Sequence, residues 1–171
     1  YDFSNHYRTV TQIKNAVVAY AHGFWVCTGS NTDAHVRIAV GTSNYANFCK
    51  DCGMTDAEVT GHGKAWANMV DSINDLISSG GYASQADAVG AADIEVSWGS
   101  AGTARRWVDA YDTVNEWPMY DFGDAAGCRQ SGTVKTAGVC GGSWSQDDLY
   151  YIAWGAPSAW GVPEIYREDS A

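Results

Sequence analysis

The stretch Ala88-Val-Gly-Ala-Ala-Asp-Ile-Glu-Val96 lies at the centre of the sequence and predicts a buried β-strand. Small and apolar residues predominate in it, and a short run of this kind is typical of a strand inside a core. Before it, apolar residues recur at helical spacing over 64–79 until two glycines end the pattern. After it, Gly99 interrupts the chain and a further helical pattern begins at Thr103, a residue type that caps helices. The centre of the chain therefore predicts a helix, a buried strand and another helix in succession.

The same alternation extends toward both ends of the chain. The other expected elements are a helix over 9–24 with a capping box at Thr9 and Gln12, a strand over 35–40, a long loop to Gly63, a strand over 118–122, a turn of helix from Ser145, and strands over 149–154 and 163–166. Strands that alternate with helices imply parallel pairing through right-handed crossovers. This order fits both an open doubly wound sheet and a barrel.

Two features favour the barrel over the doubly wound sheet. No glycine-rich phosphate-binding fingerprint follows any predicted strand. Polar and aromatic residues also gather where the strands end, as they do in barrel enzymes. We therefore expect one α/β domain over 1–171, a partial or incomplete (β/α) barrel with a mostly parallel sheet, either alone or as a segment of a longer chain. A chain of 171 residues is too short for a complete eight-fold barrel of typical size.

Charge and hydropathy argue against two kinds of partner. The chain carries 20 acidic and 10 basic residues, for a formal net charge of −10. A protein that follows the phosphates of nucleic acid needs a basic stripe, but the only adjacent basic pair is Arg105-Arg106, inside a predicted helix. No window approaches 18 consecutive apolar residues, so no membrane span is predicted. We expect neither nucleic acid nor a bilayer as a partner.

The cysteines indicate an oxidising compartment, and so a secreted or extracellular protein. They stand at positions 27, 49, 52, 128 and 140. Cys128 and Cys140 bracket a segment rich in Gly, Ser and Thr, which a disulfide would close. Cys49 and Cys52 form a C-x-x-C pair that is either a second disulfide or half of a zinc site with His62 nearby. The cysteine at 27 is left over, so one or two disulfides are expected.

Two acidic residues share the central predicted strand. Residues i and i+2 of a strand point to the same side, so Asp93 and Glu95 are expected to face one side together. Two carboxylates held close in a low-dielectric site resist double ionisation, which raises the pKa of one of them. The result is a protonated general acid beside a charged partner, as glycoside cleavage requires. The structural alternative is an ion pair with Arg37, Arg105 or Arg106.

A second acidic pair lies in Tyr120-Asp-Phe-Gly-Asp124. Asp121 ends a predicted strand, and Asp124 follows a glycine that permits a sharp turn. We expect these two residues to complete an acidic cleft in which Glu95 is the general acid. Asp93 would orient Glu95 or stabilise the developing positive charge. The alternative for the second pair is a turn in which Asp bonds its own backbone.

Eight tryptophans and ten tyrosines are many for a chain of this length. Trp66 and Trp107 lie on predicted apolar helix faces and are expected in the core. Other aromatic residues lie near predicted strand ends, where a ring can stack on the apolar face of a sugar. The expected substrate-binding residues are Trp98, Trp154, Tyr45 and Asn44.

Some of these phrases resemble known families. Ala92-Asp-Ile-Glu95 resembles the D-x-E strand ending of chitinase-like and lysozyme-like (glycoside hydrolase family 25) barrels, although the full D-x-x-D-x-D-x-E run of chitinases is absent. Most of the chain is similar to uncharacterised secreted actinobacterial proteins with a glycoside-hydrolase-like barrel. The phrases that carry this similarity are 41–45, 62–66, 92–95, 121–124, 154–155 and 163–166. The resemblance implies a barrel fold more than it implies a reaction.

The sequence thus favours a secreted glycan-directed hydrolase that acts on a polysaccharide or peptidoglycan-like polymer by carboxylate acid/base chemistry, without a cofactor or metal. The alternative is a non-catalytic extracellular binding or structural domain on a barrel scaffold. A third hypothesis is a zinc-dependent hydrolase that uses Cys49, Cys52 and His62.

Overall fold

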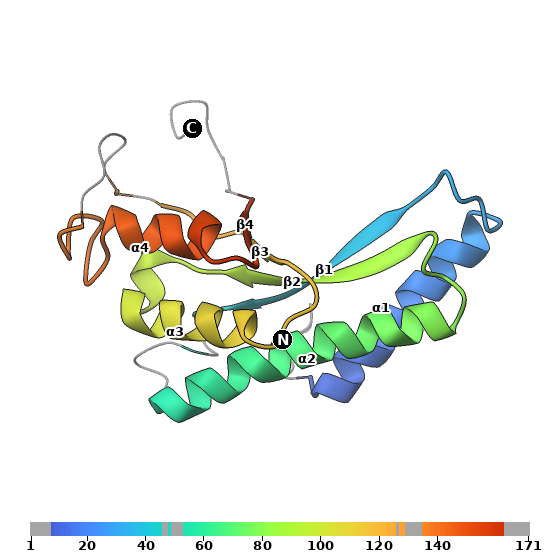
Figure 1. The fold of residues 1–171 in the computed structure, drawn as a ribbon, viewed down its shortest axis with the longest axis horizontal. Helices are drawn as coiled ribbons and strands as arrows, with labels where there is room; N and C mark the ends of the chain where they lie inside the picture. The colour runs from blue at the N-terminus through green and yellow to red at the C-terminus, as the bar shows by residue number, and fades with distance from the viewer. Residues whose placement is uncertain (1–7, 46–47, 49–52, 126, 129–134, 163–171) are drawn as a thin grey trace.

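In the computed structural model, four strands pair in parallel into one sheet, in the order β1-β2-β3-β4 (Figure 1). The structure describes residues 8–45, 48, 53–125, 127–128 and 135–162. The strands are β1 (Val36–Ser43), β2 (Ala86–Asp93), β3 (Met119–Asp121) and β4 (Ala159–Gly161). β1 and β4 form the two edges of this sheet. A mixed α/β domain with a parallel sheet is confirmed, but the sheet is open and not closed into a barrel.

One helix precedes the first strand, and helices connect the strands that follow. They are α1 (Val10–Cys27), α2 (Asp56–Ser79), α3 (Ala101–Asp112) and α4 (Gln146–Tyr150), with a 3-10 turn η2 (Val96–Trp98) and a π-helical turn η3 (Tyr151–Gly155). Helix α2 contacts α1 on one side and α3 on the other, and it packs on β2. These three helices therefore form a layer along the sheet (Figure 1).

The beginnings of the helices correct two sequence expectations. Helix α1 begins with the predicted capping box, in which Thr9 accepts from the Gln12 backbone. Helix α2 begins at Asp56, so residues 56–63 are helical and not part of a long loop. Its start is a second capping box, between Thr55 and Glu58, which satisfies backbone N–H groups that the helix leaves free. Helix α3 is capped by the Ser100 hydroxyl, whereas the expected cap, Thr103, lies inside the helix.

Two glycines near the start of α2 explain why the sequence predicted a shorter helix. Gly61 and Gly63 lie inside the helix, where glycine is a poor helix former. A Cβ at Gly63 would lie 2.5 Å from the carbonyl oxygen of Trp107 and 3.0 Å from the Cβ of Ala110. Gly63 therefore permits α2 and α3 to approach closely, at a cost in helix propensity.

The core lies between the sheet and the helix layer. The apolar stripe predicted on 64–79 is buried, as are Trp66 and Trp107. The apolar residues spaced along the helix expected over 9–24 pack only in part, since Ile13 and Val17 contact the core whereas Val10 and Tyr20 are exposed. Ala21 is the one fully buried residue of α1, so this helix packs less closely than α2 does.

The C-terminal part of the described chain differs most from expectation. Residues 149–154 were expected as a strand, but they belong to α4 and η3. A capping box between Ser145 and Asp148 begins α4, and the Arg105 guanidinium lies 4.2 Å from the Tyr151 ring centroid. The strand that does pair with β3 is β4, further along the chain. The strand expected over 163–166 lies outside the described residues.

The disulfide between Cys128 and Cys140 is confirmed, with their Cα atoms 4.0 Å apart. Cys27 is exposed and not in a disulfide. Cys49 and Cys52 lie outside the described residues. Among the helices that the structure describes, none combines the length and apolarity needed to cross a bilayer.

Candidate functional site

The C-terminal ends of β2 and β3 lie side by side, because the two strands are parallel neighbours. β2 ends at Asp93, so Glu95 lies beyond the strand and precedes the 3-10 turn η2. The sequence suggested that strand alternation places Asp93 and Glu95 on one face, but the strand ends before it reaches Glu95. The two carboxyl groups nevertheless lie close enough for the charge of Asp93 to affect the pKa of Glu95.

The Glu95 carboxyl group has the most functionally informative environment in this region. Its pKa is raised to about 7, mainly by burial and then by the negative charges of Asp124 and Asp93. Glu95 also forms hydrogen bonds with the backbone and the side chain of Asp124. Loss of solvation and nearby like charge both disfavour the ionised form of a carboxyl group. At neutral pH, part of the Glu95 population is therefore protonated and can donate a proton.

Asp121, the last residue of β3, is the second carboxyl group with a raised pKa. Only 6% of its surface is exposed, and burial raises its pKa to about 7, with smaller contributions from the charges of Asp93 and Glu95. The backbone N–H groups of Gly123 and Ile94 donate to it, and these bonds favour the ionised form. Because Asp121 is buried, it is not positioned to contact a polymer.

Gly123 makes this arrangement possible. Its backbone N–H donates to Asp121 Oδ1 at 3.2 Å. A Cβ at this position would overlap the backbone carbonyl of Ile94. The turn after β3 therefore requires glycine in order to pass against β2. The turn could be predicted from the sequence, but this contact could not.

The structure thus brings together the four predicted carboxylates. Asp93 ends β2, Glu95 follows it, Asp121 ends β3, and Asp124 bonds to Glu95. The arginines considered as structural partners bind other carboxylates. Arg37 pairs with Asp87 at 2.7 Å, Arg105 with Asp148 at 2.6 Å, and Arg106 with Asp56 at 2.9 Å. The acidic cluster therefore does not depend on these three arginines.

Two aromatic side chains lie beside Glu95. Tyr45 is 67% exposed, and its ring meets the Trp98 ring edge-on, with centroids 5.2 Å apart. Trp98 ends the 3-10 turn that begins next to Glu95. The exposed Tyr45 and the half-buried Trp98 therefore form an aromatic pair where the sequence predicted substrate binding.

The other two predicted substrate-binding residues have different surroundings. Trp154 is exposed, but it lies against Gly161 of β4, two strands away from β2. Asn44 is only 1% exposed, and its side chain bonds to the backbone of Glu95. Asn44 therefore offers no surface to a ligand.

The zinc hypothesis gains no support from the described residues. Among them, no three His, Cys, Asp or Glu side chains are arranged to hold a metal ion. His62 Nδ1 accepts a hydrogen bond from Trp107 Nε1 at 2.8 Å, and burial lowers the pKa of His62. The ring lies among the aromatic side chains of Phe48, Trp66 and Trp107, so His62 is part of the packing between α2 and α3.

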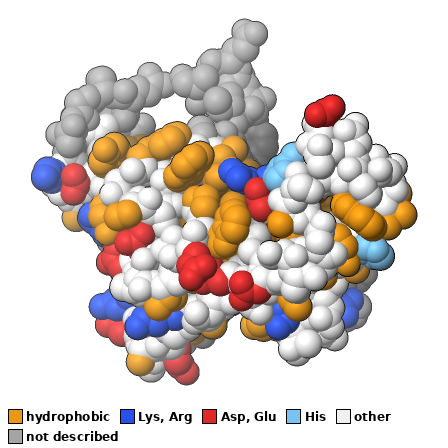
Figure 2. Space-filling model, turned by 45° about the vertical axis from the view of Figure 1, so that its right-hand side comes forward, with side chains coloured by type: hydrophobic (Ala, Val, Ile, Leu, Met, Phe, Trp, Pro, Cys, Tyr) orange, Lys and Arg blue, Asp and Glu red, His pale blue; other side chains and the backbone are white. Residues whose placement is uncertain are grey.

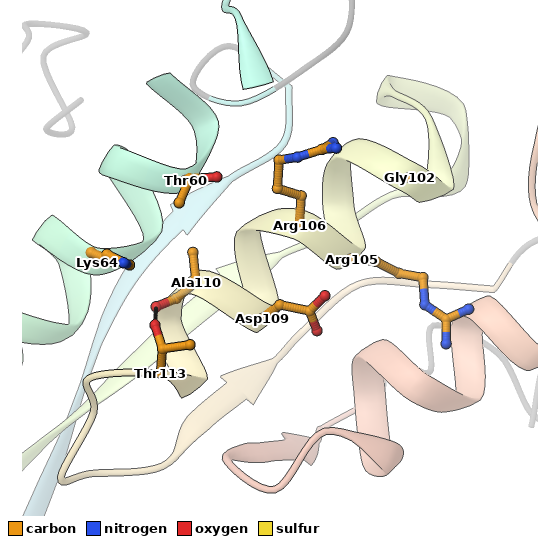
Figure 3. Close-up of a pocket in the computed structure, with 8 residues that line it drawn as sticks. All are labelled: Thr60, Lys64, Gly102, Arg105, Arg106, Asp109, Ala110 and Thr113. Carbon is orange, nitrogen blue, oxygen red and sulfur yellow. Dashed lines mark hydrogen bonds between the residues drawn. The ribbon is translucent and has the colours of Figure 1, made fainter. Parts of the chain in front are cut away.

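A separate hollow of about 380 Å³ lies between α2 and α3, and none of the four carboxylates lines it. Lys64, Arg105 and Arg106 contribute to its wall (Figure 3). Arg105 and Arg106 extend to opposite sides of α3, and each is paired with an aspartate. The cationic groups therefore do not converge on one ligand.

Figure 2 shows a face of the molecule on which exposed hydrophobic side chains lie above a group of acidic ones.

Comparison of the chain with protein-family models, with curated proteins and with solved structures gives no match.

Proposed function

We propose that the protein is a glycan-directed hydrolase that uses carboxylate acid/base chemistry. The observation that carries this proposal is the Glu95 carboxyl group, which has a pKa of about 7 next to Asp93 and Asp124. Glycoside cleavage needs a protonated carboxyl group to donate to the leaving oxygen and a second carboxylate that stays ionised. The region at the ends of β2 and β3 contains Glu95 with a raised pKa and other carboxyl groups close to it.

In this proposal each carboxylate has a distinct role. Glu95 donates its proton to the glycosidic oxygen, so its protonated fraction at neutral pH matters directly for the rate. Asp93 stabilises the positive charge that develops on the sugar. Asp124 orients Glu95 through its hydrogen bonds. The buried Asp121, whose pKa is raised in part by the charges of Asp93 and Glu95, accepts hydrogen bonds from the Ile94 and Gly123 backbone next to Glu95.

The substrate class follows from the aromatic surface. Tyr45 exposes its ring, and the half-buried Trp98 ring packs edge-on against it in the segment that follows the proton donor. Sugar rings stack on aromatic side chains through their apolar C–H faces. We propose a polysaccharide or a peptidoglycan-like polymer as the substrate, met outside the cell, where the Cys128–Cys140 disulfide is stable.

The scaffold is proposed to be part of a (β/α) barrel. Its strands follow one another in sequence order, and α1, α2 and α3 lie in one layer. A doubly wound sheet would instead reverse its strand order at one point. In barrel enzymes the chemistry lies at the carboxyl ends of the strands, where the four carboxylates are found here.

One observation favours a non-catalytic carbohydrate-binding domain as the alternative. Trp154 and Trp160 are exposed, and Trp160 stacks on Tyr120 with ring centroids 6.2 Å apart. A binding surface of this kind needs no protonated carboxyl group. Loss of binding in Trp154→Ala or Trp160→Ala, together with unchanged binding in Glu95→Gln, would support this alternative.

The test of the proposed function is the release of reducing ends from a panel of polysaccharides and purified peptidoglycan. We expect Glu95→Gln to lower turnover about 10²-fold or more, because glutamine cannot donate the proton. Glu116→Gln is the matched control, since Glu116 is exposed on the loop that enters β3 from the opposite end. Equal turnover in Glu95→Gln and the wild-type protein would contradict the proposal, as would the absence of turnover on every polymer.

A further inference from the structure

Asn44 connects the end of β1 to Glu95. Its Nδ2 group donates to the backbone oxygen of Glu95 at 2.8 Å, and its Oδ1 accepts from the Glu95 backbone N–H at 2.9 Å. Its own backbone N–H donates to the backbone oxygen of Asp93 at 3.2 Å. The residue is almost fully buried. Asn44 is thus bonded to the backbone of both Asp93 and Glu95.

These bonds matter because Glu95 lies beyond the end of the strand ladder. The last register pair between β1 and β2 is Ser43 with Asp93, so no strand residue is paired with Glu95. Buried backbone groups need partners, and an amide side chain offers a donor and an acceptor in one plane. Asn44 therefore replaces the missing strand partner and fixes the backbone of Glu95 at two points.

We propose that Asn44 is a positioning residue, whose side chain holds the backbone of Glu95 so that its carboxyl group stays turned toward Asp124. The catalytic meaning of this role rests on the proposed function, but the geometry itself does not. Asp121 holds the backbone at Ile94, but Asn44 makes the two side-chain bonds to the backbone of Glu95 itself, and without them the Glu95 carboxyl group can turn into water. Its pKa would then fall toward the ordinary value of 4.5, because burial is the main cause of the increase.

The chain contains a matched control for this experiment. Asn74, on α2, forms the same pair of bonds with the backbone of Ala88, with both distances 2.8 Å. Like Asn44, it is buried, and it also bonds to β2. Ala88 lies seven residues before Glu95, which is roughly 20 Å away along an extended chain. Removal of Asn74 should therefore disturb the packing of β2 without reaching the Glu95 carboxyl group.

The experiment is a carbon NMR titration of the Glu95 carboxyl group, assigned by its absence in Glu95→Gln. We expect a midpoint near 7 in the wild-type protein and in Asn74→Ala, and a midpoint shifted toward 4.5 in Asn44→Ala. Asn44→Ser provides a second variant if alanine prevents folding, since its shorter side chain does not reach Glu95. If the hydrolase is active, kcat at pH 7 should also fall about tenfold to a hundredfold with little change in KM, as expected for a misplaced proton donor.

A measurement on the unaltered protein completes the test. The backbone amide proton of Glu95 should exchange slowly with solvent, as should that of Ala88, because each donates to a buried asparagine. Fast exchange at Glu95, or a midpoint that stays near 7 in a folded Asn44 variant, would overturn the proposal. A protein without activity that still shows the expected midpoints would contradict the hydrolase but support the role of Asn44.

Discussion

Substitution of Glu95 by glutamine should make the protein more stable at neutral and alkaline pH. The pKa of Glu95 is raised from 4.5 to about 7 in the folded protein, so the folded state binds this proton more tightly than the unfolded state does. The stabilisation from proton binding is fully present below pH 4.5 and is lost as the pH rises to 7. Above pH 7 the folded protein holds a carboxylate in surroundings that disfavour its charge.

The size of this effect follows from the pKa difference. A shift of this size corresponds to about 3 kcal/mol at most, and water around a partly exposed side chain reduces it to about 1–2 kcal/mol. Glutamine keeps the shape and carries no charge. We therefore compare the unfolding free energy of Glu95→Gln with that of the wild-type protein at each pH. The difference, variant minus wild type, should be about 1–2 kcal/mol larger at pH 8 than at pH 4.5.

Urea denaturation of both proteins at several pH values between 4.5 and 8.5 measures this difference. Taking the difference cancels contributions from other groups, such as His62, whose pKa is lowered and which therefore destabilises the fold on the acidic side. Glu116→Gln should show no comparable pH dependence. A difference between Glu95→Gln and wild type that is constant with pH would refute the assignment of a raised pKa to Glu95.

Three further predictions concern the scaffold. Gly63→Ala should lower the unfolding free energy by about 1–3 kcal/mol, because the methyl group meets the Trp107 backbone. Gly61→Ala, with open space around it, should be neutral or stabilising by up to about 1 kcal/mol. Equal effects at the two positions would contradict the close approach of α2 and α3. Gly123→Ala should push the turn away from Ile94 and lower the raised pKa of Asp121 in an NMR titration. Gly102→Ala, in open space, is the control. An unchanged titration midpoint of Asp121 in Gly123→Ala would contradict the close contact between Gly123 and Ile94. Replacement of Cys128 and Cys140 by serine should cost about 3 kcal/mol in thermal or urea unfolding, from the loop entropy of a closure with a sequence separation of 12; an unchanged stability would show that the loop is held by other contacts.

The sequence was sufficient for features that depend on local patterns. Periodic apolar residues predicted α1, most of α2 and β3, and the alternation of helices and strands predicted the parallel sheet. The segment between Cys128 and Cys140 is short and rich in small residues, and this composition predicted their disulfide. Local pattern failed where tertiary contacts decided the structure. Residues 56–63 form a helix despite two glycines, because one of these glycines lets α3 pack closely.

The candidate site shows the same division. The acidic residues could be found from their positions near the ends of predicted strands, and the structure places all four together. The role of Asn44 could not be found in this way, because it depends on bonds to a residue 51 positions away in the sequence. The residue at which β2 ends could not be predicted from the sequence either. The position of Glu95 relative to Asp93 was predicted from strand alternation, but β2 ends at Asp93, two residues before Glu95.

The measurement that tests the central claim most directly is the pH dependence of kcat/KM for glycan cleavage by the wild-type protein and by Glu95→Gln. If Glu95 is the proton donor, kcat/KM should fall as the pH rises through about 7, where Glu95 loses its proton, and this fall should be absent from the residual rate of Glu95→Gln. A rate that stays constant from pH 6 to about pH 9, or that falls equally in both proteins, would contradict the assignment of Glu95 as the general acid.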